Sequence, residues 1–193
     1  MRPISEWDDN RRNNNCYAFA FGDLRVNSPS KLQPGQLSGN KPLTDKTYSC
    51  PALRQLVLDD HPEASVIPDG QKCAHGHYRV ALFLDNDGKN RDYHFYREVA
   101  PNTWLHKPGS LPVSNVDDSG NVIHDPRKAD RDYVNDGPET SGYNYAEYCG
   151  MFCAPAVATT GDGSGRGIAM ARWIHILVSI MIIAGILMFI RGM

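Results

Sequence analysis

The sequence contains three residues that could form one catalytic site. Two are histidines at the ends of a predicted hairpin, and the third is a distant cysteine. His94 opens an alternating run, Pro101-Asn102 marks a turn, and His106 closes the returning run. In antiparallel pairing, the first residue of one strand lies beside the last residue of the next. The spacing therefore predicts that His94 and His106 lie side by side at one end of a sheet.

The cysteine is Cys16, which follows three asparagines and begins a short apolar run that ends at Phe21. Asparagine is a favoured N-cap, so the pattern predicts a buried helix with Cys16 in its first turn. Unpaired N–H groups and the helix dipole favour a thiolate there. We therefore expect a cysteine hydrolase with Cys16 as nucleophile, His94 as base and His106 as the orienting group.

These motifs resemble those of papain-fold cysteine hydrolases, namely the NlpC-type peptidoglycan endopeptidases and the related CHAP amidases. Asn15-Cys16-Tyr17-Ala18-Phe19 is similar to the motif at the start of their nucleophile helix, with Asn in place of Asp and Tyr-Ala in place of Ser-Gly. The stretch from His94 to His106 resembles the pair of histidines around their hairpin. The resemblance implies a peptide or amide substrate, with cell-wall peptides first.

The resemblance also implies an α+β fold of papain-like, NlpC-type architecture, in which the N-terminal nucleophile helix packs on an antiparallel sheet. Two further elements are predicted from the residues themselves. The apolar run from His77 to Asp85 indicates a central strand, and Ser49 followed by Pro51 indicates a short helix that ends at Leu58. We expect residues 1–155 to form this domain.

Two other residues are alternatives within the same site. His77 also opens a strand and is an alternative base, and Asn115 is an alternative third member in place of His106. A triad needs an imidazole near the thiolate and a polar group that orients it, so residue types alone leave these choices open.

The remaining cysteines allow a different kind of site. Cys73, His75 and His77 would share one face of a strand, and Cys50 could complete a metal site of the zinc type. The hydrolase interpretation, by contrast, requires no metal and no cofactor.

Cys149 and Cys153 are spaced for one face of a helix. A redox-active dithiol normally has two intervening residues rather than three, so we expect packing, or a disulfide with the region of Cys50 and Cys73.

The C-terminal residues predict a membrane anchor. Residues 156–167 have the composition of a flexible linker, and residues 168–191 are predicted to form one transmembrane helix. The apolar run from Trp173 to Ile190 would span about 27 Å at about 1.5 Å per residue, close to the ~30 Å hydrocarbon core. The lipid bilayer is therefore an expected partner through Trp173–Ile190.

The net charge and the N-terminal residues limit the possible binding partners and the cellular compartment. With 20 basic and 22 acidic residues, the chain lacks the positive excess of a nucleic-acid-binding surface, so no nucleic acid is expected. The first residues lack the apolar core of a secretory signal. These observations predict a single-pass, C-terminally anchored protein with a cytoplasm-facing domain and reduced cysteines.

The leading functional hypothesis is a membrane-anchored cysteine hydrolase that cleaves peptide or amide bonds through a Cys-His-His site. One alternative is a non-catalytic, membrane-anchored structural or interaction protein on the same fold, such as a component of a virus particle or a secretion apparatus. The other alternative is the metal-binding domain. A reactive thiolate at Cys16 would favour the first hypothesis over the second.

Overall fold

The computed structural model describes residues 1–40, 43–44, 48–86, 91–134 and 142–156. The predicted linker from residue 157 on and the predicted transmembrane segment, residues 168–191, lie outside the described residues. Within the described ranges, no helix combines the length and the apolar character needed to cross a membrane.

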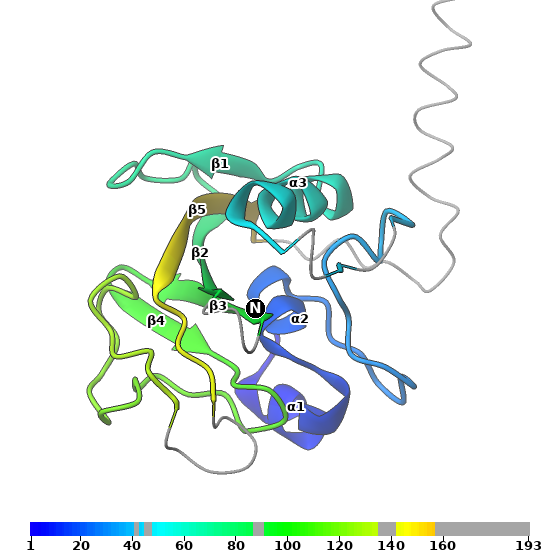
Figure 1. The fold of residues 1–193 in the computed structure, drawn as a ribbon, viewed down its shortest axis with the longest axis horizontal. Coiled ribbons are helices and arrows are strands. Elements are labelled where there is room, and N and C mark those ends of the chain that lie inside the picture. The colour runs from blue at the N-terminus through cyan, green and yellow to red at the C-terminus, as the bar shows by residue number, and fades with distance from the viewer. Residues whose placement is uncertain (41–42, 45–47, 87–90, 135–141, 157–193) are drawn as a thin grey trace, which may run out of the picture. The chain divides into compact units, whose positions relative to one another are not determined.

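One antiparallel sheet forms the core (Figure 1). Its strands are β1 (Ser65–Ile67), β2 (His77–Asn86), β3 (Arg91–Ala100), β4 (Thr103–His106) and β5 (Glu147–Pro155), in the order β1-β5-β2-β3-β4. The run from Val80 to Leu84 in β2 is fully buried, as expected for a strand covered on both faces. The prediction that this run forms a central strand is confirmed.

The described helices are short, and two of them, those that begin at Cys16 and Cys50, begin close to where the sequence indicated. They are α1 (Ile4–Asp9), a 3-10 turn (Arg11–Asn13), α2 (Cys16–Phe21) and α3 (Cys50–Asp60). The Asn15 side chain caps α2 by accepting a hydrogen bond from the backbone N–H of Ala18 at 3.1 Å, and Ser49 caps α3 in the same way. Helix α2 ends after six residues because Gly22 adopts a left-handed conformation, with φ 79°.

The predicted α+β papain-like fold is wrong for the part of the chain that the structure describes. The described core is mostly sheet, its α-helices have only 6, 6 and 11 residues, and two disulfides cross it. The local helix starts were correct, but the helical layer came from the resemblance. The nucleophile helix of the resemblance is cut to six residues here, because α2 stops at Gly22 and turns follow it.

Two apolar clusters cover the two faces of the sheet. The helix-side cluster joins α1, α2 and α3 to the sheet and includes Trp7, Tyr17, Phe19, Phe95 and Phe152. The loop-side cluster lies under residues 108–134 and 142–146 and includes Phe83, Tyr96, Trp104, Tyr133 and Tyr145. Successive residues of a strand point to opposite faces, so the two clusters alternate along β3.

A bulge in β5 assigns its two cysteines to different faces. Leu82 pairs with Gly150 but Phe83 pairs with Tyr148, so Cys149 is the extra residue. Gly150 has φ 123°, a backbone conformation that favours glycine. Cys149 therefore belongs to the helix-side cluster and Cys153 to the loop-side cluster. The predicted shared helical face is wrong, because the segment is a strand with a bulge.

Both cysteines of β5 form disulfides, one on each face. Cys50 at the start of α3 bonds to Cys149, and Cys73, between β1 and β2, bonds to Cys153. The predicted disulfide with the region of Cys50 and Cys73 is confirmed, whereas the predicted reduced state is wrong for these four cysteines.

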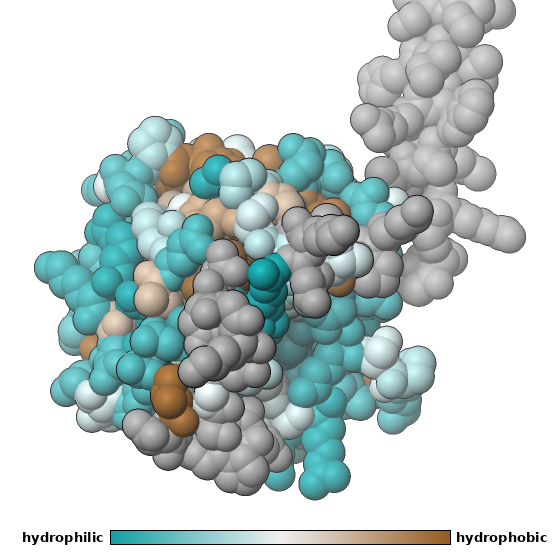
Figure 2. All heavy atoms as spheres, in the orientation of Figure 1, coloured by the Kyte–Doolittle hydropathy of each residue, from teal (hydrophilic) through white to brown (hydrophobic). Residues whose placement is uncertain are grey.

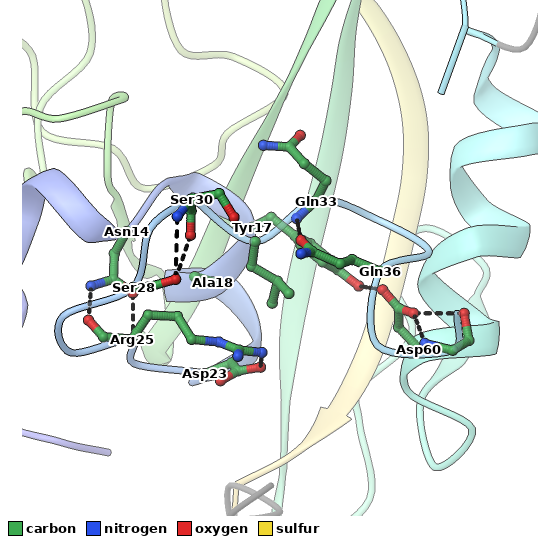
Figure 3. A network of polar contacts seen from close by, with 12 residues as sticks. Asn14, Tyr17, Ala18, Asp23, Arg25, Ser28, Ser30, Gln33, Gln36 and Asp60 are labelled. Atoms are coloured by element: carbon green, nitrogen blue, oxygen red, sulfur yellow. Dashed lines mark hydrogen bonds and ion pairs between the residues drawn. The ribbon is translucent and has the colours of Figure 1, made fainter. Parts of the chain in front are cut away.

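One buried carboxylate holds the loop after α2 in place. Asp60, at the end of α3, accepts hydrogen bonds from the Tyr17 hydroxyl at 2.8 Å and from the backbone N–H of Gly35 at 2.7 Å (Figure 3). Ser38 donates both its backbone N–H and its hydroxyl to the same carboxylate. Hydrogen bonds to a charged group contribute more than neutral ones, so Asp60 fixes α2 and α3 against each other.

The visible face of the domain is largely hydrophilic, with apolar atoms gathered mainly along β1 and α3 (Figure 2). The large apolar residues that are exposed are scattered along the chain: Met1, Val26, Leu37, Val66, Leu111, Val122 and Val134. Scattered exposure of this kind is normal for a folded domain and indicates no docking surface.

Candidate functional site

The hairpin brings the two predicted histidines into contact. Nε2 of His94 lies 2.8 Å from Nδ1 of His106, and both residues are buried. Asn102, with φ 56°, turns the chain between β3 and β4, and the register then places His106 opposite Tyr96. The two rings therefore meet across neighbouring strands, as the spacing predicted.

A backbone carbonyl sets the tautomers of this pair. Nε2 of His106 lies 2.9 Å from the carbonyl oxygen of Val116, which can only accept a hydrogen bond. His106 Nε2 therefore carries a proton, and its Nδ1 accepts a hydrogen bond from His94 Nε2. Sequence reasoning missed Val116, because every residue type supplies a carbonyl and no side-chain signal marks this one.

Burial keeps both imidazoles neutral. It lowers the pKa of His106 to about 4, against a smaller opposite effect of the Val116 carbonyl. Burial also lowers the pKa of His94 well below its usual value, and the neighbouring His106 and Arg131 act in the same direction. Neither ring carries a charge near neutral pH.

Tyrosines surround the histidine pair. The Tyr145 ring stacks on His94 with centroids 5.0 Å apart, and the Tyr96 ring stacks on His106 at the same distance. The Tyr145 hydroxyl donates to Asp92 at 2.7 Å. Beside His94 lies a cavity of about 50 Å³, lined also by Asp92, Tyr133, Tyr143 and Tyr145. This volume holds a few water molecules rather than a peptide.

Cys16 lies in a different environment. It is buried in the helix-side cluster, and its Sγ lies 3.6 Å from the carbonyl oxygen of Tyr93. Within the described part of the chain, no hydrogen bond joins Cys16 to His94 or His106, whose rings contact residues of the loop-side cluster. The structure thus pairs the two histidines with each other and gives the thiol a backbone partner.

Burial also changes the chemistry of the thiol. It raises the pKa of Cys16 to about 12, and the nearby Asp92 carboxylate acts in the same direction. Helix α2 has only six residues, so its dipole is too weak to offset this desolvation. Cys16 is therefore a protonated hydrogen-bond donor at neutral pH, and the thiolate expected from its position is not favoured.

The alternative site residues lie elsewhere. His77 is exposed at the start of β2, where its Nδ1 is 3.4 Å from the carbonyl oxygen of His75. Asn115 accepts a hydrogen bond from the backbone N–H of Ile123 through its own backbone carbonyl. Neither residue makes a hydrogen bond to Cys16 in the ranges that the structure covers.

The predicted alternative of a metal-binding domain is wrong. Cys50 and Cys73 are both bonded in disulfides and cannot act as thiolate ligands. No group of three or more His, Cys, Asp or Glu side chains suited to a metal ion occurs among the described residues.

The chain is similar to insoluble matrix shell protein 1 of Ruditapes philippinarum. The two are 34% identical over 127 residues, which cover 64% of this chain and 75% of that protein. No family model matches the chain. No solved structure matches it either. The resemblance to NlpC-type and CHAP enzymes stays a prediction.

These findings correct the leading functional hypothesis. The matched relative is a matrix protein by name, and the two disulfides are bonds that persist in oxidising compartments. The predicted membrane-anchored cysteine hydrolase with a cytoplasm-facing domain is therefore wrong in its activity and in its localisation.

Proposed function

Because this chain belongs to the family of insoluble matrix shell protein 1, we propose that it is a non-catalytic structural component of an extracellular matrix. The observation that carries the proposal is the 34% identity, which extends over 75% of that protein. An alignment of 127 residues is far longer than one short motif.

The disulfides support this proposal. Cys50–Cys149 stabilises the helix side of β5 and Cys73–Cys153 stabilises its loop side, at sequence separations of 99 and 80. Closing loops of this length removes chain entropy from the unfolded state, and each bond then stabilises the domain by about 4 to 5 kcal/mol on that model. A secreted protein exposed to proteases gains from such bracing.

The histidine pair and the thiol fit a structural role. Each group links parts of the chain: His94 links β3 to β4, His106 links β4 to Val116, and Cys16 links α2 to β3. All three side chains are buried and neutral at physiological pH. Satisfied buried polar groups of this kind specify one arrangement of the core.

Fractionation of the tissue that makes the chain tests the proposal. An antibody raised against residues 1–156 would follow the protein through extraction of the extracellular matrix with salt, then detergent, then denaturant with a reducing agent. We expect it to remain in the residue after salt and detergent and to be released by denaturant with reductant. Recovery in the cytosolic fraction would contradict a matrix role.

Thiol labelling of the purified full chain tests the non-catalytic part separately. We expect iodoacetamide at mildly acidic pH to leave Cys16 unmodified in the folded protein and to label it after unfolding. A Cys16→Ala variant shows the background of the unfolded sample. Rapid labelling of the folded protein at Cys16 would mean that the thiol is activated, and the structural assignment of this residue would fail.

A further inference from the structure

Arg97 is a buried guanidinium with few partners. It lies on β3, is 5% exposed, and donates one hydrogen bond, from Nη1 to the Phe19 carbonyl oxygen at 3.3 Å. Its guanidinium carbon lies 3.9 Å from the centroid of the Tyr78 ring. Among the described residues no carboxylate lies within ion-pair distance of it, and the bond to Phe19 uses one of its five N–H donors.

Arg79, on the neighbouring strand β2, is paired with a carboxylate, as arginines away from solvent usually are. Its guanidinium also lies over an aromatic ring, that of Trp104 at 5.3 Å, but Nε donates to the Glu98 carboxylate at 2.7 Å. Leaving a buried cation without an anion costs several kcal/mol. Burial accordingly lowers the pKa of Arg97, with a smaller opposite effect of Tyr78.

The cavity beside Arg97 has a second buried donor. Its volume is about 300 Å³, and Trp7, Phe21, Tyr78 and Arg97 line it. Trp7 is fully buried, and its indole Nε1–H has no hydrogen-bond partner in the part of the chain that the structure describes. None of the described residues that line the cavity is acidic. Met1 and Arg2 line the same cavity, so cationic and polar donors and three aromatic rings surround one space.

Capping of α2 explains only part of this arrangement. A cation near the C-terminal carbonyls of a helix is favourable, which accounts for the bond from Arg97 to Phe19. It does not account for the unpaired Trp7 N–H or for the cavity between the two side chains. A buried polar group without a partner normally marks a missing water, ion or ligand.

We propose that this cavity, called here the Arg97 cavity, binds a carboxylate carried on a small apolar body. A guanidinium fork matches the two oxygens of a carboxylate, and the Trp7 indole supplies a further donor. The rings of Phe21 and Tyr78 cover the apolar part of the ligand. The volume lies at the lower end of small-molecule sites, so the ligand is a free organic acid or a single acidic side chain of a polypeptide.

Titration of the ¹⁵N-labelled full chain with sodium benzoate tests this proposal. The signals to follow are the indole Nε1–H of Trp7, assigned with a Trp7→Phe variant, and the Nε–H of Arg97. We expect both to shift in a saturable way with a Kd on the order of 1 mM or tighter, as ligand efficiency allows for so small a molecule. The indole signal of Trp104, beneath the paired Arg79, should not move.

Two controls test whether the cavity recognises the negative charge of the carboxylate. Benzamide has the shape of benzoate without the carboxylate and should not produce the shifts. Arg97→Lys keeps a cation but loses the fork, so benzoate should bind about tenfold more weakly. The matched variant Arg79→Lys should leave the affinity unchanged. Melting curves of both variants show whether each is folded before the titration is interpreted.

The outcomes distinguish a free acid from an acidic side chain as the source of the carboxylate, and some of them would overturn the proposal. If benzoate shifts the Trp7 and Arg97 signals, a free acid is supported as the ligand. If only a short alanine peptide with one glutamate shifts them, an acidic side chain of a polypeptide is supported. Equal binding of benzamide, or unchanged binding by a folded Arg97→Lys variant, would show that no carboxylate is recognised.

Discussion

Lys107 offers the sharpest test of what holds the N-terminal segment in place. The residue is fully buried, and its Nζ lies within hydrogen-bond distance of four carbonyl oxygens: those of Arg11 at 2.9 Å, Asn14 at 2.8 Å, Gly109 at 2.7 Å and Leu111 at 3.2 Å. Its three N–H groups are shared among these acceptors. It thereby joins the segment before Cys16 to the loop after β4. Lys107→Met removes the donor while roughly keeping the length of the side chain.

The expected loss of stability follows from the unsatisfied carbonyls. Each buried acceptor left without a partner costs about 1 to 3 kcal/mol, and water can reach some of the four after the change. The variant should therefore lose about 3 to 5 kcal/mol of unfolding free energy, even though it no longer buries a charge. Urea denaturation followed by circular dichroism measures this, with the exposed Lys128→Met as a control that should stay within about 0.5 kcal/mol.

The pH dependence of the unfolding free energy, measured for the wild type and for Lys107→Met, gives an independent check. Burial lowers the pKa of Lys107 from 10.5 to about 8, so between these values the unfolded chain binds more protons than the folded one. This group therefore makes stability rise with pH across that window, and the gain should be absent from Lys107→Met. A variant as stable as the wild type, or an identical pH profile, would refute the assignment of Lys107 as the cation that holds these carbonyls.

Three further predictions concern the other buried features. The double variants Cys50→Ala/Cys149→Ala and Cys73→Ala/Cys153→Ala should each lose about 2 to 5 kcal/mol in urea denaturation, and an unchanged midpoint would contradict the bracing role. His106 has a folded pKa of about 4 against 6.5 unfolded, so stability should fall as pH drops from 6.5 towards 4. His106→Phe should weaken this loss of stability at acidic pH. A stability-versus-pH profile equal to that of the wild type would contradict the assignment of the effect to His106. Gly150→Ala should cost about 1 kcal/mol or more because of its φ of 123°, whereas a neutral effect would mean that the bulge relaxes.

Local signals in the sequence located most of the elements. Asn15 and Ser49 mark helix starts because their side chains accept hydrogen bonds from N–H groups of the next turn, an interaction that spans three residues. The apolar run from His77 to Asp85 marks a strand, and the turn at Pro101-Asn102 brings His94 to His106. Each of these features depends on near neighbours in the chain, so the residues themselves suffice to predict it.

The candidate site depended on contacts that the sequence does not contain. Cys16 occupies the predicted helix position, but its reactivity follows from burial against residues of β3 that lie far along the chain. The partner of His106 is the Val116 carbonyl, which has no side-chain signature. The family resemblance supplied a mechanism, and the similarity to a matrix protein overturned it.

The sequence by itself determined the helix starts, the central strand and the meeting of the two histidines, because hydrogen bonds and turn geometry within a few residues decide them. Only the tertiary structure decided which face of the sheet each cysteine of β5 joins, since one bulged residue, Cys149, reverses the alternation. It also decided that the Cys16 thiol stays protonated and that Arg97 is buried with no carboxylate of the described residues within ion-pair distance. Desolvation depends on everything packed around a group, and that packing exists only once the chain has folded.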